Sequence, residues 1–253
     1  MSRIFDSHAH YDDPRFDEDR QALLSSLPSK GIVGVITCGT DIVTSQKSLK
    51  IAEKYPYIKA ACGIYPGEAD KIAPGDFASL SEMLKNKNCV AIGEIGLEYH
   101  YDDVPRATQL ACFEKQLKMA VYLDMPVIVH DREAHEDTMR LLRKYKPKGV
   151  LHCYSGSVEM LKEIVKLGMY IGLGGAVTFK NAQKPLEAAS FVPLDRLLVE
   201  TDAPYMSPVP FRGKRCDSSM IAYSAAKIAE ARGMEVDALL AATAENARRL
   251  FQI

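Results

Sequence analysis

The chain has 253 residues, a length that suits one large α/β domain or two small ones. Hydrophobic residues make up 47% of it, enough for a large core, and a formal net charge of −1 argues against nucleic-acid binding through a broad basic surface. The six cysteines form no C-x-x-C pair, no apolar run is long enough to span a bilayer and no signal-peptide pattern precedes the first strand, so we expect a cytoplasmic protein without membrane association.

Short apolar runs alternate with amphipathic stretches along nearly the whole sequence. The apolar runs predict strands at 4–10, 31–38, 58–64, 89–95, 126–130, 149–152, 169–173 and 196–202. The amphipathic stretches predict helices at 17–29, 41–54, 76–85, 105–123, 135–145, 158–167, 184–190, 219–232 and 236–251. Eight strands separated by helices in this length predict a single-domain (β/α)₈ barrel, a TIM barrel, over residues 1–253.

Two glycine-rich signatures of nucleotide binding are missing from the sequence. No Gly-x-Gly-x-x-Gly follows the first strand, and no Gly-x-x-x-x-Gly-Lys-Ser/Thr occurs anywhere in the chain. We therefore expect no nucleotide cofactor.

Polar side chains stand where the predicted strands end, which is the end of a barrel that carries the active site. His8 and His10 are two residues apart on one strand, so their imidazoles point toward the same side. Such a pair is a weak signal alone, but histidines and acids at the ends of other strands strengthen it. The full set is His8, His10, Glu94, His130, His152 and Asp202.

This set suits two divalent ions. His8, His10 and Asp202 come from strands that adjoin when the barrel closes, so they are expected to hold one ion, and His130 and His152 are expected to hold the other. Glu94 lies between the two groups and has two oxygens with which to bridge the ions. Mixed imidazole and carboxylate ligands favour Zn²⁺, Mn²⁺ or Fe²⁺ over Mg²⁺. In catalysis, Asp202 is the candidate acceptor for the proton of the attacking water, and Glu94 is the bridging carboxylate.

A cationic loop follows the last strand, in residues 206–215. Arg212, Lys214 and Arg215 lie there within four residues, and Lys180 follows the seventh strand, so these cations are candidate phosphate contacts. A solvated charge run is the plainer interpretation. Tyr99 and Tyr154 follow the fourth and sixth strands and are candidates for stacking on bases or sugars, although rim tyrosines are commonly just half-buried.

Several motifs resemble those of the TatD family of metal-dependent deoxyribonucleases, within the amidohydrolase superfamily. They are Asp6-Ser-His-Ala-His10, Gly93-Glu-Ile-Gly-Leu97, Pro126-Val-Ile-Val-His130, His152-Cys-Tyr-Ser-Gly156, Thr178-Phe-Lys-Asn181, Glu200-Thr-Asp-Ala-Pro-Tyr205 and Arg212-Gly-Lys-Arg215. The resemblance implies a two-metal phosphodiesterase with the six residues above as ligands. It also implies DNA as the substrate and cytoplasmic exonuclease action on single strands or ends.

The chain departs from the family pattern at a few positions. Tyr65 and Gly67 stand where similar members have histidines, Glu98 stands where they have Asp, and Cys216 follows the cationic motif in place of Asn. The metal set is intact, but the departures leave the substrate open. A small-molecule amidohydrolase or lactonase is one alternative, and a non-catalytic metal-binding barrel is another.

Overall fold

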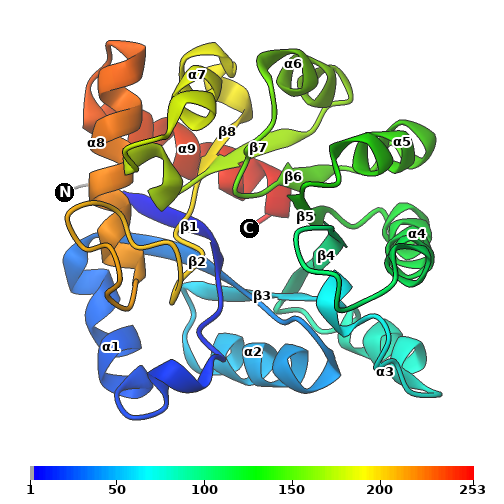
Figure 1. Ribbon diagram of the computed structural model, residues 1–253. Helices are drawn as coiled ribbons and strands as arrows, with labels where there is room; N and C mark the ends of the chain where they lie inside the picture. Colours follow the sequence, from blue (N-terminus) through cyan, green and yellow to red (C-terminus); the bar gives the residue numbers. More distant parts are fainter. Residues whose placement is uncertain (1–2) are drawn as a thin grey trace.

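The computed structural model describes residues 3–253, which form a nearly closed barrel of eight parallel strands in sequence order (Figure 1). The strands are β1 (Ile4–Ala9), β2 (Ile32–Cys38), β3 (Ile58–Cys62), β4 (Cys89–Glu98), β5 (Val127–Arg132), β6 (Gly149–Leu151), β7 (Tyr170–Leu173) and β8 (Leu197–Val199). The expected single-domain (β/α)₈ barrel is therefore confirmed.

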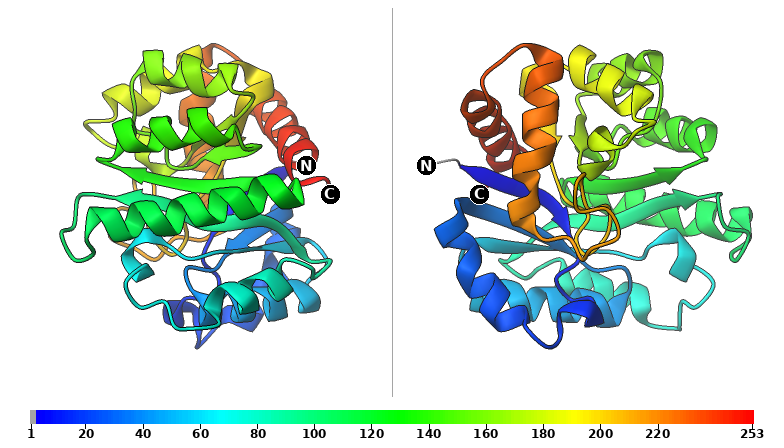
Figure 2. Two further views of the ribbon diagram at one scale, coloured as in Figure 1. Left: turned by 90° about the vertical axis from the view of Figure 1, so that its right-hand side faces the viewer. Right: turned by 60° about the vertical axis from the view of Figure 1, so that its left-hand side comes forward.

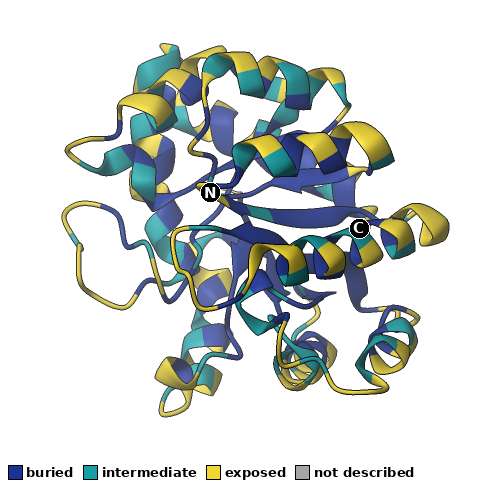
Figure 3. Ribbon diagram, turned by 45° about the vertical axis from the view of Figure 1, so that its right-hand side comes forward, coloured by how far each residue is buried: buried dark blue, intermediate teal, exposed yellow. Residues whose placement is uncertain are grey.

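Helices follow the strands and surround the sheet. They are α1 (Arg20–Ser26), α2 (Ile42–Lys54), α3 (Asp76–Met83), α4 (Arg106–Leu123), α5 (His135–Tyr145), α6 (Val158–Lys166), α7 (Gln183–Phe191), α8 (Ile221–Arg232) and α9 (Val236–Phe251). Their inner faces are buried against the strands and their outer faces are exposed (Figure 3). Asp41 begins α2 because its side chain accepts a hydrogen bond of 2.7 Å from Thr44 N.

The interior of the barrel is built in layers. Apolar residues of successive strands point inward and pack with α9, which crosses one end of the barrel behind the strands of Figure 1 and appears in red in Figure 2. This apolar layer includes Ile36, Ala61, Ile128, Val150, Leu198, Ala247 and Phe251. Alternate residues of a strand share a face, so the next inward positions after Ile128, Val150 and Leu198 are His130, His152 and Glu200. A polar layer thus lies directly on an apolar one.

The barrel closes where β1 meets the segment that follows β8. Asp202 N donates a hydrogen bond of 2.9 Å to His8 O, and His10 N donates one of 2.6 Å to Ala203 O. Ala9 and Ala203 form an isolated parallel bridge there. The contacts that close the barrel are therefore made by the backbone of predicted metal ligands.

Asp6 reinforces this closure from inside β1. Its fully buried carboxylate accepts hydrogen bonds from Thr201 Oγ1 at 2.6 Å, Thr201 N at 3.0 Å and Ser218 Oγ at 2.7 Å. Tyr11 OH lies 2.7 Å from Ser218 Oγ and extends the network. One carboxylate thereby joins the first strand to two segments near the end of the chain.

Two strand ends differ from the sequence-based expectation. β8 ends at Val199 instead of Asp202, because Asp202 takes a φ of 63° and its backbone pairs with β1. β4 continues beyond Glu94 to Glu98, because its ladder with β5 extends to the pair Glu98–Arg132. Glu94 lies inside β4, at a register irregularity between Ile92 and Ile95.

Replacing Asp6 tests the closure. Asp6→Ala leaves two hydroxyl groups and two backbone N–H groups, those of His8 and Thr201, buried without this acceptor, so we expect the free energy of unfolding to fall by about 3 kcal/mol or more. Urea unfolding followed by circular dichroism measures this loss. Asp17→Ala, which removes an exposed acid, is the control and is expected to cost less than about 1 kcal/mol. Equal small losses for both variants would contradict the role given to Asp6.

Candidate metal centre

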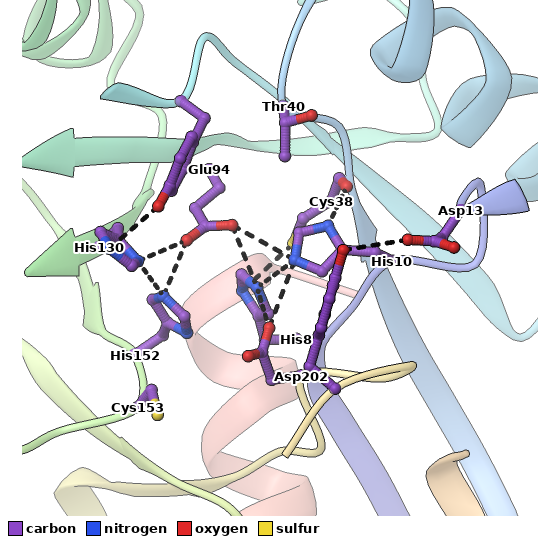
Figure 4. A network of polar contacts seen from close by, with 12 residues as sticks. His8, His10, Asp13, Cys38, Thr40, Glu94, His130, His152, Cys153 and Asp202 are labelled. Atoms are coloured by element: carbon purple, nitrogen blue, oxygen red, sulfur yellow. Dashed lines mark hydrogen bonds and ion pairs between the residues drawn. The ribbon is translucent and has the colours of Figure 1, made fainter. Parts of the chain in front are cut away.

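Glu94 lies at the centre of a cluster of imidazoles, and its two oxygens face different histidine pairs (Figure 4). Oε1 is 2.9 Å from His130 Nδ1 and 2.9 Å from His152 Nε2. Oε2 is 3.3 Å from His10 Nε2 and 3.5 Å from His8 Nε2. The carboxylate is buried, so these nitrogens are its principal polar environment.

Asp202 faces the His8 and His10 side of this cluster. Its Oδ1 lies 3.5 Å from His8 Nε2 and 3.4 Å from His10 Nε2. The structure therefore brings all six predicted ligands together, although they are distant in sequence. Their donor atoms form three groups with spacings of at most 4.8 Å: His8, His10 and Glu94; His8, His152 and Asp202; and Glu94, His130 and His152. This donor set fits divalent transition-metal ions.

Neighbouring groups orient two of the imidazoles. His10 Nδ1 is 2.8 Å from Cys38 O, so it donates to that carbonyl and directs Nε2 toward the cluster. His130 Nε2 is 3.1 Å from Glu98 Oε2, which leaves Nδ1 to face Glu94. Carboxylate and carbonyl partners of this kind fix the tautomer that a metal ligand needs.

Glu200 has a related position beside His152. Its Oε1 lies 3.7 Å from His152 Nδ1 and accepts a hydrogen bond of 2.5 Å from Cys153 N. Its Oε2 has no hydrogen-bond partner among the described residues. Gly172 makes space for this side chain, since a Cβ there would lie 2.4 Å from Glu200 Oε2.

The acids and histidines of the cluster shift each other's pKa values toward the charged forms. Burial raises the pKa of Glu94, but His152 and His8 outweigh it and hold the pKa well below its usual range. Burial likewise raises the pKa of Asp202, and the hydrogen bonds with His10 and His8 lower it further than burial raises it. Burial lowers the pKa of His10, but Asp202 and Glu94 bring it well above its usual value. The two carboxylates are therefore ionised at neutral pH.

A cavity of about 510 Å³ opens above this cluster. Its described lining consists of His10, Asp12, Asp13, Pro14, Thr40, Thr44, Tyr65, Glu68, Glu94, Glu98, Tyr101, His130, Arg132, His152, Asp202, Tyr205 and Met206. The six residues expected to contact substrate lie outside this lining.

The predicted cations are placed around the loop after β8. Arg215 forms an ion pair of 2.5 Å with Asp19, and the guanidinium of Arg212 lies 3.6 Å from the centroid of the Phe179 ring. Lys214 and Lys180 are exposed. Arg212 and Arg215 therefore hold this loop against neighbouring segments.

The two predicted tyrosines are bound to nearby groups. Tyr154 is buried and its hydroxyl donates a hydrogen bond of 2.6 Å to Ser157 O. The hydroxyl of Tyr99 donates one of 2.8 Å to Asp137 Oδ2, and Arg106 lies over its ring. Neither ring belongs to the lining of the cavity.

Residues not assigned to substrate from the sequence line the cavity instead. Tyr65 donates a hydrogen bond of 3.2 Å to Glu98 Oε2 and its hydroxyl lies 3.4 Å from His130 Nε2. The resemblance described above implies His and Asp at these two positions, and the Tyr65 and Glu98 found there contact each other. Tyr101, Arg132 and Tyr205 complete the rim. The sequence signal for Arg132 was its place two residues after a predicted ligand.

A (β/α)₈ barrel with a histidine and carboxylate centre at the carboxyl ends of its strands defines a class of metal-dependent hydrolases. The sequence model of the TatD related DNase family matches residues 5–252. The chain belongs to this family, and it is a metal-dependent hydrolase.

Named relatives and one solved structure agree with this membership. The chain is 38% identical to the "Uncharacterized metal-dependent hydrolase YabD" of Bacillus subtilis, over 99% of each sequence. It is 31% identical to the "3'-5' ssDNA/RNA exonuclease TatD" of Salmonella typhimurium, again over 99% of each. The crystal structure of the TatD homologue YjjV from Escherichia coli superposes with a TM-score of 0.94 at 32% identity, covering 100% of this chain and 99% of the other. Within residues 3–253, no helix has the length and apolar character to cross a membrane.

Metal binding is expected to release protons. The pKa of His10 and that of His152 are raised well above the usual value, so in the metal-free protein both imidazoles are protonated at neutral pH and must deprotonate to bind an ion. Affinity for Zn²⁺ or Mn²⁺ should therefore rise between about pH 6 and about pH 8. Isothermal titration calorimetry in buffers of different ionisation enthalpy measures the released protons. His135 is paired with Asp131 outside the cluster, so His135→Ala is the control and should behave as wild type. Binding heats that do not depend on the buffer would contradict the expectation.

Proposed function

We propose that this protein is a divalent-metal-dependent deoxyribonuclease that hydrolyses the phosphodiester bonds of DNA, acting as an exonuclease on single strands or ends. The observation that carries the proposal is the convergence of four imidazoles and the carboxylate of Asp202 around Glu94 at the floor of an open cavity. The Salmonella typhimurium relative, named as a single-stranded DNA and RNA exonuclease, supports the choice of a nucleic-acid substrate.

Divalent ions bound to this donor set would supply Lewis acidity toward the phosphodiester and the attacking water. The chain supplies the proton acceptor. Asp202 is ionised at neutral pH, and its side chain is 20% exposed, which leaves it accessible from the cavity. We assign Asp202 as the general base toward water and Glu94, whose side chain is 4% exposed, as the carboxylate that holds the centre together.

The different surroundings of the two Glu94 oxygens favour a site for two ions. His8 and His10 lie within 3.5 Å of Oε2 and are also faced by Asp202, while His130 and His152 adjoin Oε1. Nitrogen-rich ligation favours Zn²⁺, Mn²⁺ or Fe²⁺ over Mg²⁺. Each ion would share Glu94 and keep its own imidazoles.

Metal content of single-histidine variants tests this division. Wild type, reconstituted with Mn²⁺ or Zn²⁺ and freed of excess metal, should hold two ions per chain by mass spectrometry. His8→Ala and His130→Ala should each lose about one ion, and Glu94→Ala about both, because Glu94 is shared. His135→Ala is the matched control. One ion in wild type, or loss of the same ion in both histidine variants, would contradict the two-ion proposal.

Asp202→Asn tests catalysis. The amide keeps the size of the side chain but does not accept the proton, so we expect cleavage of labelled single-stranded DNA with Mn²⁺ or Mg²⁺ to slow by roughly 10²- to 10⁴-fold. Gel analysis of the products measures the rate. Asp195→Asn changes an exposed acid near the opposite end of β8 and should cleave as wild type. Equal cleavage by wild type and Asp202→Asn would reject the assignment.

A small-molecule amidohydrolase or lactonase is a second candidate, favoured by the charge of the cavity. Apart from the ligands, the lining contains four carboxylates, those of Asp12, Asp13, Glu68 and Glu98. This environment is less suited to polyanions than the sequence suggested. Metal-dependent turnover of lactones, together with no cleavage of DNA by wild type, would establish this function instead.

We also propose a reducing, cytoplasmic compartment. All six cysteines are free thiols in the structure, and five of them are buried. Assay of the thiols in freshly prepared protein with Ellman's reagent under denaturing conditions should count six.

A further inference from the structure

We propose that Arg132 and Tyr101 form a nucleotide subsite at the mouth of the cavity, where Arg132 binds a phosphate next to the scissile one and Tyr101 stacks on its base. This inference rests on the proposed nuclease function and names how the substrate is held. It is based on three features: the position of Arg132 in the cavity, the availability of its guanidinium, and the exposure of the Tyr101 ring.

Arg132 is positioned where a bound DNA strand would run. Arg132 lies two residues after His130 on β5, so both side chains leave the strand on the same side. The two positions differ by roughly 6–7 Å along the strand, toward the mouth of the cavity. Both residues line the cavity, so Arg132 borders the same space as the metal centre.

The guanidinium of Arg132 is available to a phosphate, although its charge also acts on Glu98, its register partner on β4. Of the lining residues that the structure describes, it is the one lysine or arginine, among several carboxylates. No acidic side chain within residues 3–253 forms an ion pair or hydrogen bond with its guanidinium. Arg15, by contrast, is bound to Asp13 at 3.1 Å, and Arg215 is bound to Asp19 at 2.5 Å. An unpaired guanidinium in this setting is suited to the bidentate binding of a phosphate.

The ring of Tyr101 is available beside it. Tyr101 is 52% exposed, and the guanidinium carbon of Arg132 lies 5.2 Å from its ring centroid. His100 holds the loop in place, since its Nδ1 is 2.8 Å from Glu133 Oε1 and its ring meets that of Tyr101 edge-on at 4.8 Å. These contacts hold the segment after β4 against the segment after β5 and keep the Arg132 guanidinium beside the Tyr101 ring.

The other exposed tyrosine of the cavity is already covered. The guanidinium of Arg15 lies 3.9 Å from the centroid of the Tyr205 ring and is itself paired with Asp13. The hydroxyl of Tyr205 also donates to Asp13 Oδ2, at 3.2 Å. Arg15 is closer to the Tyr205 ring than Arg132 is to the Tyr101 ring, 3.9 Å against 5.2 Å, and Asp13 holds it there, so the Tyr101 side is the favoured one.

The experiment compares two substrates in the metal-loaded full-length protein. A short oligothymidylate offers a phosphate next to the scissile one, and bis(p-nitrophenyl) phosphate offers a single phosphodiester. Arg132→Ala should lower kcat/KM for the oligonucleotide by roughly 10- to 100-fold and leave the chromogenic ester within about 3-fold of wild type. Arg132→Lys should restore part of the loss. Tyr101→Ala should lower kcat/KM for the oligonucleotide roughly 10-fold, and Tyr101→Phe should retain the wild-type value.

The salt dependence of oligonucleotide binding is a second measurement. Loss of one phosphate contact should reduce the slope of log affinity against log salt concentration by about 1 in Arg132→Ala. Arg143→Ala is the matched control, because it removes one cation from the exposed side of α5 in the same β/α unit. It should change neither kcat/KM nor the slope.

The outcomes separate this inference from the function on which it rests. Wild type that cleaves the ester but not the oligonucleotide rejects the nuclease function and the subsite together. Wild type that cleaves both, with Arg132→Ala unaffected on the oligonucleotide or equally impaired on both substrates, retains the nuclease and overturns the subsite. An Arg143→Ala defect equal to that of Arg132→Ala also overturns it, since general charge would then explain the effect.

Discussion

The structure depends on one buried carboxylate that is surrounded by imidazoles. Glu94 has lost almost all of its contact with solvent, and an ionised carboxylate in that position is costly unless cationic groups surround it. Four histidine nitrogens lie within 3.5 Å of its oxygens and form the polar environment of this carboxylate. The strands that carry these histidines bring the polar groups together between the apolar layer and the cavity.

Much of this centre could be predicted from alternation along strands. His130 and His152 each lie two residues after an inward-facing apolar residue, so a strand and an inward Ile128 or Val150 already determine their direction. Strand ends were less predictable. β4 runs on past Glu94 because β5 continues to offer it hydrogen-bonding partners, which is information held in another segment of the chain.

The substrate contacts could not be predicted to the same degree. Residue type and position after a strand made Arg215 a candidate, but whether its charge is free depends on Asp19, almost two hundred residues away in sequence. Arg132 carried no obvious motif, yet in the structure its charge is unpaired and faces the cavity. Loop conformation and long-range ion pairs decide such cases, and neither follows from local periodicity.

The residues at positions 65 and 98 are far apart in sequence but adjacent in the structure. Tyr65 and Glu98 share a hydrogen bond and both adjoin His130. The larger phenol and the longer carboxylate therefore occupy one wall together. Together these two side chains shape the wall of the cavity beside His130.

The way in which the barrel closes has a consequence for how the molecule opens. β1 and β8 share no continuous ladder, and the seam between them is fastened by Asp6 and by the backbone around His8 and Asp202. An ion bound by the side chains of His8 and Asp202 would cross-link β1 to the segment that follows β8. Amide exchange and protease access along this line would then report on metal loading, and the N-terminal strand would be the segment released first when the ion is withdrawn.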